Sequence, residues 1–136
     1  MIQTLIFWPF LAQFALTLIV LSWLAYSRVS LVAKHGMPEI LKTGFPRHVN
    51  NASDNLKNQF EVPVLFYALC LFFYVTNGVT KLVIIAAWIF ILARIFHALV
   101  HLTKNIVFPY RFGAFFISVA AVLFMTILAV IHLASI

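Results

Sequence analysis

The chain has 136 residues, of which 65% are hydrophobic and only 9% are charged, and its formal net charge is +6. A water-soluble domain needs roughly a quarter of its residues charged to cover its surface, so the composition excludes that class. The single cysteine, Cys70, excludes an intrachain disulfide scaffold. The basic residues lie beside long apolar runs, where they indicate membrane topology and contacts with anionic headgroups, and we expect no nucleic-acid partner.

Four apolar runs are suited to membrane-spanning helices, each of which needs about 20 mostly apolar residues. The first run, residues 4–26, contains no charged side chain, and we expect a span there rather than a cleaved signal peptide. The second run, residues 62–76, is short, so we expect a polar helical extension that begins at an N-cap, Ser53. Pro63 is expected to kink this helix. The remaining two spans are expected at residues 82–102 and 112–134.

Basic residues are distributed unevenly over the predicted loops. The first loop, residues 28–52, and the polar segment that follows it to Lys57 contain five of them. The third loop adds Lys104 and Arg111, whereas the second contains only Lys81. Cytoplasmic loops carry the excess of lysine and arginine. We therefore expect a single four-span domain over residues 1–136 in a bacterial inner membrane, with loops one and three in the cytoplasm and both termini outside it.

Glycine and proline also recur in the first loop, as Gly36, Pro38, Gly44 and Pro46. Both residue types interrupt helices. One long regular helix is therefore not expected across this loop.

Ionisable residues lie inside the third span. Arg94, His97 and His101 are at positions i, i+3 and i+7, which share one helical face. Arg94 precedes Leu102 by two turns, which places it about 12 Å inside the cytoplasmic end. An unpaired arginine there would cost at least about 2.5 kcal/mol, so it must face protein or water. We expect Glu61 to be its counter-charge, with a hydrogen bond to the asparagines before the second span as the alternative.

The segment that precedes the second span has a matching polar stripe. Asp54, Asn58 and Glu61 recur at i, i+4 and i+7, flanked by Asn55 and Gln59. Buried ionic networks often fix helix packing. Intramembrane ionisable residues also mark ligand sites. The sequence therefore leaves open a structural network and a polar ligand pocket that opens to the cytoplasm.

The two histidines of the third span could be metal ligands, so zinc and haem sites are considered. His97 and His101 have the i, i+4 spacing of a zinc-binding helix, but no glutamate lies between them as in zinc hydrolases. A third ligand would have to be Glu61 or His48. Haem ligation needs two histidines at one depth, and His101 and His132 lie near opposite ends of their spans. We therefore expect no bound metal.

Three short motifs connect these polar residues to a known family. They are Asn55-Leu56-Lys57-Asn58-Gln59-Phe60-Glu61-Val62-Pro63, Arg94-Ile95-Phe96-His97 and Pro109-Tyr110-Arg111. Together with the four-span layout, they resemble the MAPEG family, the membrane-associated proteins in eicosanoid and glutathione metabolism. The resemblance implies an all-α homotrimer of four-helix bundles, with glutathione bound between neighbouring subunits in a cavity that faces the cytoplasm.

The resemblance also implies roles for individual residues. Asn55 matches the family asparagine, and Arg94 and His97 match the family Arg-x-x-His pair. Arg111 matches, with one extra loop residue, the arginine that stabilises the glutathione thiolate, and we expect it to be the catalytic residue. A guanidinium beside the sulfur would favour the nucleophilic thiolate. The expected ligand-binding residues are Asn55, Asn58, Glu61, Arg94, His97, His101 and Arg28.

Several positions depart from the family pattern. Residues 51–55 read Asn-Ala-Ser-Asp-Asn, where many catalytic members have arginines that hold the carboxylates of glutathione. Asn58 replaces a glutamate, and His101 and Phe115 replace tyrosines. Two functions are therefore expected. One is a glutathione-dependent transferase, peroxidase or isomerase that acts on lipophilic electrophiles, and the other is a non-catalytic trimer that binds lipids or a partner protein.

Overall fold

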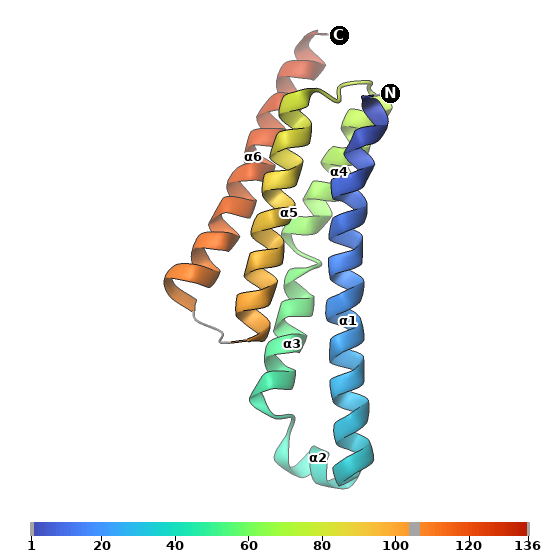
Figure 1. The fold of residues 1–136 in the computed structure, drawn as a ribbon, viewed down its shortest axis with the longest axis vertical. Helices are drawn as coiled ribbons and strands as arrows, with labels where there is room; N and C mark the ends of the chain where they lie inside the picture. Colours follow the sequence, from blue (N-terminus) through green and yellow to red (C-terminus); the bar gives the residue numbers. More distant parts are fainter. Residues whose placement is uncertain (1, 104–106, 136) are drawn as a thin grey trace.

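The protein is a bundle of long helices that lie side by side, as Figure 1 shows. The structure, a computed structural model, describes residues 2–103 and 107–135, and within these ranges every regular element is helical. The elements are a 3₁₀ turn (Gln3–Ile6), α1 (Phe7–His35), α2 (Met37–Thr43), α3 (Arg47–Asn58), α4 (Val62–Val75), α5 (Lys81–Leu102), a turn at Val107–Arg111 and α6 (Phe112–Ser135).

Four helical segments are long and apolar enough to cross a membrane. They are Gln3–His35, Arg47–Val75, Lys81–Leu102 and Val107–Ser135. This confirms the expected all-α architecture with four spans. Lys104, one of the basic residues of the predicted third loop, lies outside the described residues.

The helix α5 lies at the centre of the bundle and packs most extensively against α6. Small side chains on α6 are buried at this contact, namely Ala114, Ser118 and Ala121. Small residues let two helix backbones approach closely in a membrane, where helices gain little from apolar burial alone. On the other side of α5, the ring of Phe90 stacks on Phe66 of α4, with centroids 4.2 Å apart. These contacts hold α5 between the other spans.

The first helix is longer than the sequence predicts. α1 continues past residue 26 and ends at His35, so its last turns, α2 and the first turn of α3 occupy much of the expected loop at residues 28–52. Gly36 and Gly44 separate these helices, with φ angles of 77° and 75°. Glycine tolerates this left-handed region without steric cost. As expected, no single long helix crosses this segment, and the structure fills much of it with shorter helical pieces.

The second span is divided into two helices. α3 begins at Arg47 after an extended Pro46, so the expected start with Ser53 as N-cap is wrong. α3 ends at Asn58, and Glu61 has non-helical φ and ψ of −97° and −100° before α4 begins. Pro63 lies in the first turn of α4, where its missing N–H breaks no helical hydrogen bond. The expected kink near Pro63 is thus confirmed as a complete break.

The start of α1 and the end of α6 lie at the same end of the bundle, and α2 lies at the opposite end (Figure 1). The turn between α4 and α5 is held there by side chains from both termini. The Gln3 amide donates to the Asn77 carbonyl at 3.1 Å and accepts from the Val79 N–H at 3.0 Å. The Nε2 atom of His132 lies 3.2 Å from the Thr76 carbonyl. These bonds close the bundle at the end that holds the two termini.

Candidate functional site

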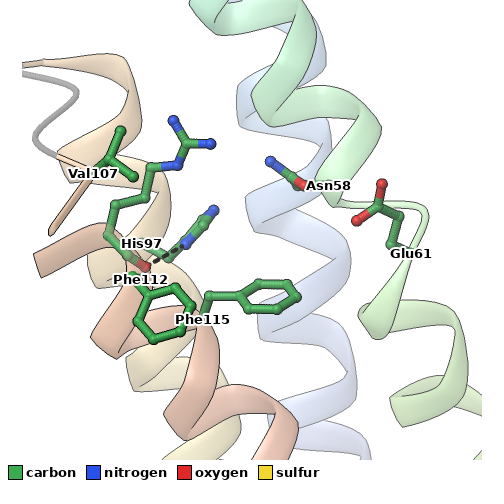
Figure 2. A pocket seen from close by; sticks show the side chains of 7 residues that line it. Asn58, Glu61, His97, Val107, Phe112 and Phe115 are labelled. Carbon is green, nitrogen blue, oxygen red and sulfur yellow. Dashed lines mark hydrogen bonds between the residues drawn. The ribbon is translucent and has the colours of Figure 1, made fainter. Parts of the chain in front are cut away.

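A pocket of about 200 Å³ lies between the α3–α4 break and the start of α6, as Figure 2 shows from close by. Its lining residues are Asn58, Glu61, His97, Val107, Arg111, Phe112 and Phe115. Asn58 and Glu61 face the space because α3 ends between them and the chain leaves the helix there. Arg111 faces it because α6 begins at the next residue. The pocket therefore depends on two places where helices end or begin.

The side chain of His97 connects α5 to the start of α6. Its ring is 2% exposed, and its Nδ1 atom lies 3.2 Å from the backbone carbonyl oxygen of Arg111, marked by the dashed line in Figure 2. A carbonyl oxygen only accepts hydrogen bonds, so Nδ1 must carry a proton and donate. In a neutral ring, the hydrogen bond made by one ring nitrogen determines whether the other nitrogen carries a proton. The fold thereby sets both the orientation and the tautomer of this ring.

Arg94 lies fully buried behind the pocket. Its Nη2 atom donates to the backbone carbonyl of Asn58 at 2.8 Å. Asn58 is the last residue of α3, and terminal carbonyls lack a helical N–H partner and attract cations. Across residues 2–103 and 107–135, the side-chain ion pair within 4 Å joins Lys57 to Asp54, at 3.0 Å. Arg94 and Glu61, both among the described residues, form no ion pair within 4 Å, although Glu61 acts on the Arg94 guanidinium electrostatically as an opposite charge. The alternative that we expected, a hydrogen bond to an asparagine before the second span, is present.

Three buried amide side chains form a second polar element. Gln13 of α1 donates to Oε1 of Gln59 at 2.8 Å, and Gln59 donates to Oδ1 of Asn55 at 2.9 Å. Asn55 in turn donates to the Ala98 carbonyl of α5 at 3.2 Å. Hydrogen-bonded polar side chains hold helices together in a membrane. Asn55 therefore belongs to a hydrogen-bonded network, whereas Asn58 and Glu61 line the pocket. Ligand binding in that pocket stays a prediction.

Four of the expected ligand-binding residues lie outside the pocket lining, namely Asn55, Arg94, His101 and Arg28. The buried ring of His101 is stacked on His97, with centroids 5.9 Å apart and planes at 19°. Arg28 is exposed on α1, where it donates to Oγ of Ser53 at 3.2 Å and lies 5.4 Å from the centre of the Phe45 ring. His101 thus supports the site from behind, whereas the structure does not bring Arg28 to the lining residues.

The structure also brings in residues that the sequence reasoning missed. Gln13 is the partner of Gln59. The signal for Gln13 is an amide side chain inside an otherwise apolar span. Val107 and Phe112 add apolar surface beside Arg111, and only their closeness to that residue in the chain could have indicated them. Among the residues that the structure describes, no three His, Cys, Asp or Glu side chains are grouped to hold a metal ion.

Positive charge predominates around the pocket. Arg111 lines it, and both Arg111 and the buried Arg94 act electrostatically on His97. Glu61, on the opposite side, is the acidic residue of the lining. Clustered charge of one sign raises the local concentration of ligands of the opposite sign. The site therefore suits an anionic ligand that also presents one cationic group.

The chain thus combines four spans with a buried arginine and a buried histidine near the start of the last span. A comparison with protein families matches nearly the whole chain. Residues 6–131 match the MAPEG family. The chain belongs to the MAPEG family. Neither the search of curated proteins nor that of solved structures found a match. MAPEG membership and the four apolar helices together establish a multi-pass membrane protein whose family is glutathione-related.

Proposed function

We propose that this MAPEG protein is a glutathione-dependent enzyme of the transferase type that acts on lipophilic electrophiles dissolved in the bilayer, with peroxidase and isomerase chemistry as variants. The observation that carries the proposal is the pocket in which His97 lies opposite Asn58 and Glu61 (Figure 2), with Arg111 also in its lining. Its positive charge fits the carboxylates of glutathione, and Glu61 suits the ammonium group. Asn58 suits the peptide groups, because an amide both donates and accepts hydrogen bonds.

Arg111 is proposed as the catalytic residue that stabilises the thiolate. A free thiol of the cysteine type has a pKa near 8.5, so little thiolate is present at neutral pH without help. A guanidinium stays charged at any working pH and favours the anion without tuning of its own. Arg111 is half-buried at the mouth of the pocket, where a soluble thiol and a membrane-dissolved electrophile can meet. Phe112 and Phe115 supply apolar surface for the electrophile.

The assembly that we propose is a homotrimer in a bacterial inner membrane. The pocket of about 200 Å³ is smaller than the roughly 300–1,000 Å³ that small-molecule sites usually enclose. A neighbouring copy that covers the open side would complete a site for a tripeptide. With the basic loops in the cytoplasm, the pocket receives glutathione from that side. Native mass spectrometry in detergent should show trimers, and a protein that is only monomeric would contradict this assembly.

Glutathione titration into detergent-purified protein tests the function. We expect binding heat and a rise in absorbance near 240 nm, which reports thiolate at a neutral pH well below the ~8.5 of a free thiol. Arg111→Ala should abolish the absorbance while the trimer persists. Arg28→Ala is the matched control, because it removes an arginine that is exposed and bonded to Ser53, and it should leave the signal unchanged. A wild-type protein that neither binds glutathione nor forms thiolate would refute the proposal.

A second candidate is a non-catalytic trimeric subunit that binds lipid or a partner protein. A groove of about 460 Å³ between α4 and α6 favours it, because its lining is almost entirely apolar. The groove is lined by Leu65, Ala68, Leu69, Phe72, Val122, Leu123, Thr126, Ala129, Val130 and Leu133. The absence of thiolate, together with co-purified lipid in this groove, would favour this candidate over the enzyme.

A further inference from the structure

The second ring nitrogen of His97, Nε2, forms no hydrogen bond with the residues that the structure describes. Because Nδ1 donates to the Arg111 carbonyl, the neutral ring has its lone pair on Nε2. This Nε2 atom is buried. A buried acceptor without a donor costs free energy. Figure 2 shows it directed away from the carbonyl and toward Asn58, on the opposite side of the pocket.

Charged groups from three elements surround the His97 ring. Arg94 and His101 on α5 and Arg111 before α6 act on the ring electrostatically, and Glu61 from the α3–α4 break lines the same pocket. A proton on the ring would place a further positive charge beside these two guanidinium groups. An anion beside the ring, such as a thiolate, would offset that charge.

We infer that His97 is the proton acceptor of the proposed reaction and takes the thiol proton of glutathione on Nε2; the inference rests on the proposed function. The S–H bond breaks, the proton moves to Nε2, and the electron pair stays on sulfur. The Arg111 carbonyl holds the imidazolium through Nδ1, and the Arg111 guanidinium faces the thiolate. When the sulfur adds to an activated carbon–carbon double bond, the C–S bond forms and the proton returns from Nε2 to the neighbouring carbon. Atoms and charge then balance with no further reactant.

The destination of the proton distinguishes His97 from Arg111 acting alone. If Arg111 alone stabilises the thiolate, each bound glutathione releases one proton to the buffer. If His97 accepts the proton, thiolate forms and the proton stays in the complex. Titration calorimetry at neutral pH in phosphate and in Tris separates proton release from proton retention. These buffers differ in ionisation enthalpy, so the difference between the two binding heats gives the number of protons released for each glutathione bound. Absorbance near 240 nm, at a pH below the ~8.5 of a free thiol, measures thiolate in the same samples.

His97→Asn is the matched variant. The asparagine amide can place its N–H near the position of Nδ1 and keep the bond to the Arg111 carbonyl, but it has nothing at the position of Nε2. We expect glutathione binding to be retained within a few-fold, and the thiolate signal at neutral pH to fall at least about tenfold, which corresponds to 1.4 kcal/mol. Raising the pH should restore thiolate with release of one proton. His132→Asn, in the last turns of α6 beside the turn between α4 and α5, should give the same thiolate signal as the wild type.

Each outcome decides the inference. Wild-type thiolate without proton release supports His97 as the acceptor. Wild-type thiolate with one proton released, or an undiminished signal in His97→Asn, overturns the role of His97 and leaves the glutathione function standing. Absence of any glutathione binding heat overturns the proposed function and the inference together. If His97→Asn loses the trimer, the proton count of the wild-type protein still decides, because that measurement needs no variant.

Discussion

Replacement of Gln59 by leucine tests the buried amide chain that joins three helices. The Gln59 side chain accepts from Gln13 at 2.8 Å and donates to Asn55 at 2.9 Å, and the exposed fractions of the three side chains are 0–1%. Leucine makes neither bond, so the Gln13 amide and the Asn55 carbonyl oxygen both lose a buried partner. The interhelical bond to Gln13 is worth about 0.6 kcal/mol on average and up to ~1.7. The bond to Asn55, within the end of α3, adds about 0.5–1.5 kcal/mol, so we expect a destabilisation of about 1–3 kcal/mol.

A double-mutant cycle measures the energy of the hydrogen bond between Gln13 and Gln59. Gln13→Leu alone leaves Oε1 of Gln59 without its donor, and this unpaired oxygen no longer exists when Gln59→Leu is added. The double variant should therefore lose less than the sum of the single variants, with a coupling of about 0.6–1.7 kcal/mol. Unfolding in mixed detergent micelles with increasing dodecyl sulfate, followed by circular dichroism, measures each free energy. Additivity within roughly 0.5 kcal/mol would refute the bond between the two amides.

Two further predictions concern the contact of Gly78 with His132 and an exposed ion pair. In Gly78→Ala, the added Cβ would lie 2.5 Å from Cδ2 of His132, so the ring must turn away from the Thr76 carbonyl and we expect a loss of about 1–3 kcal/mol in thermal unfolding. The same substitution in a His132→Ala background should cost much less, and an equal cost would exclude this contact as the cause. Asp54 and Lys57 form an exposed ion pair, so Asp54→Ala should change stability by at most about 1 kcal/mol, and a larger shift in the unfolding curve would show that the pair has a structural role.

The sequence by itself determined the four spans, because length and apolarity are local properties and a bilayer of fixed thickness accepts only helices that satisfy their own backbone. The sequence also indicated where the helices are interrupted. Pro63 cannot sit in a helix interior, and Gly36 and Gly44 take up left-handed backbone angles. The motif around Arg94 and His97 pointed to the MAPEG family, which the match over residues 6–131 shows.

Only the tertiary structure decided the partners of the polar side chains. Helical periodicity assumes an unbroken helix, but the break before α4 removes Glu61 from the face of α3. The same break leaves the terminal carbonyl of Asn58 without a helical partner, and Arg94 donates to it. The bond of Gln13 to Gln59 spans 46 positions of sequence, so no local pattern could reveal it. Which buried polar groups meet depends on how whole helices pack, because each such group must find a donor or acceptor wherever the packing places one.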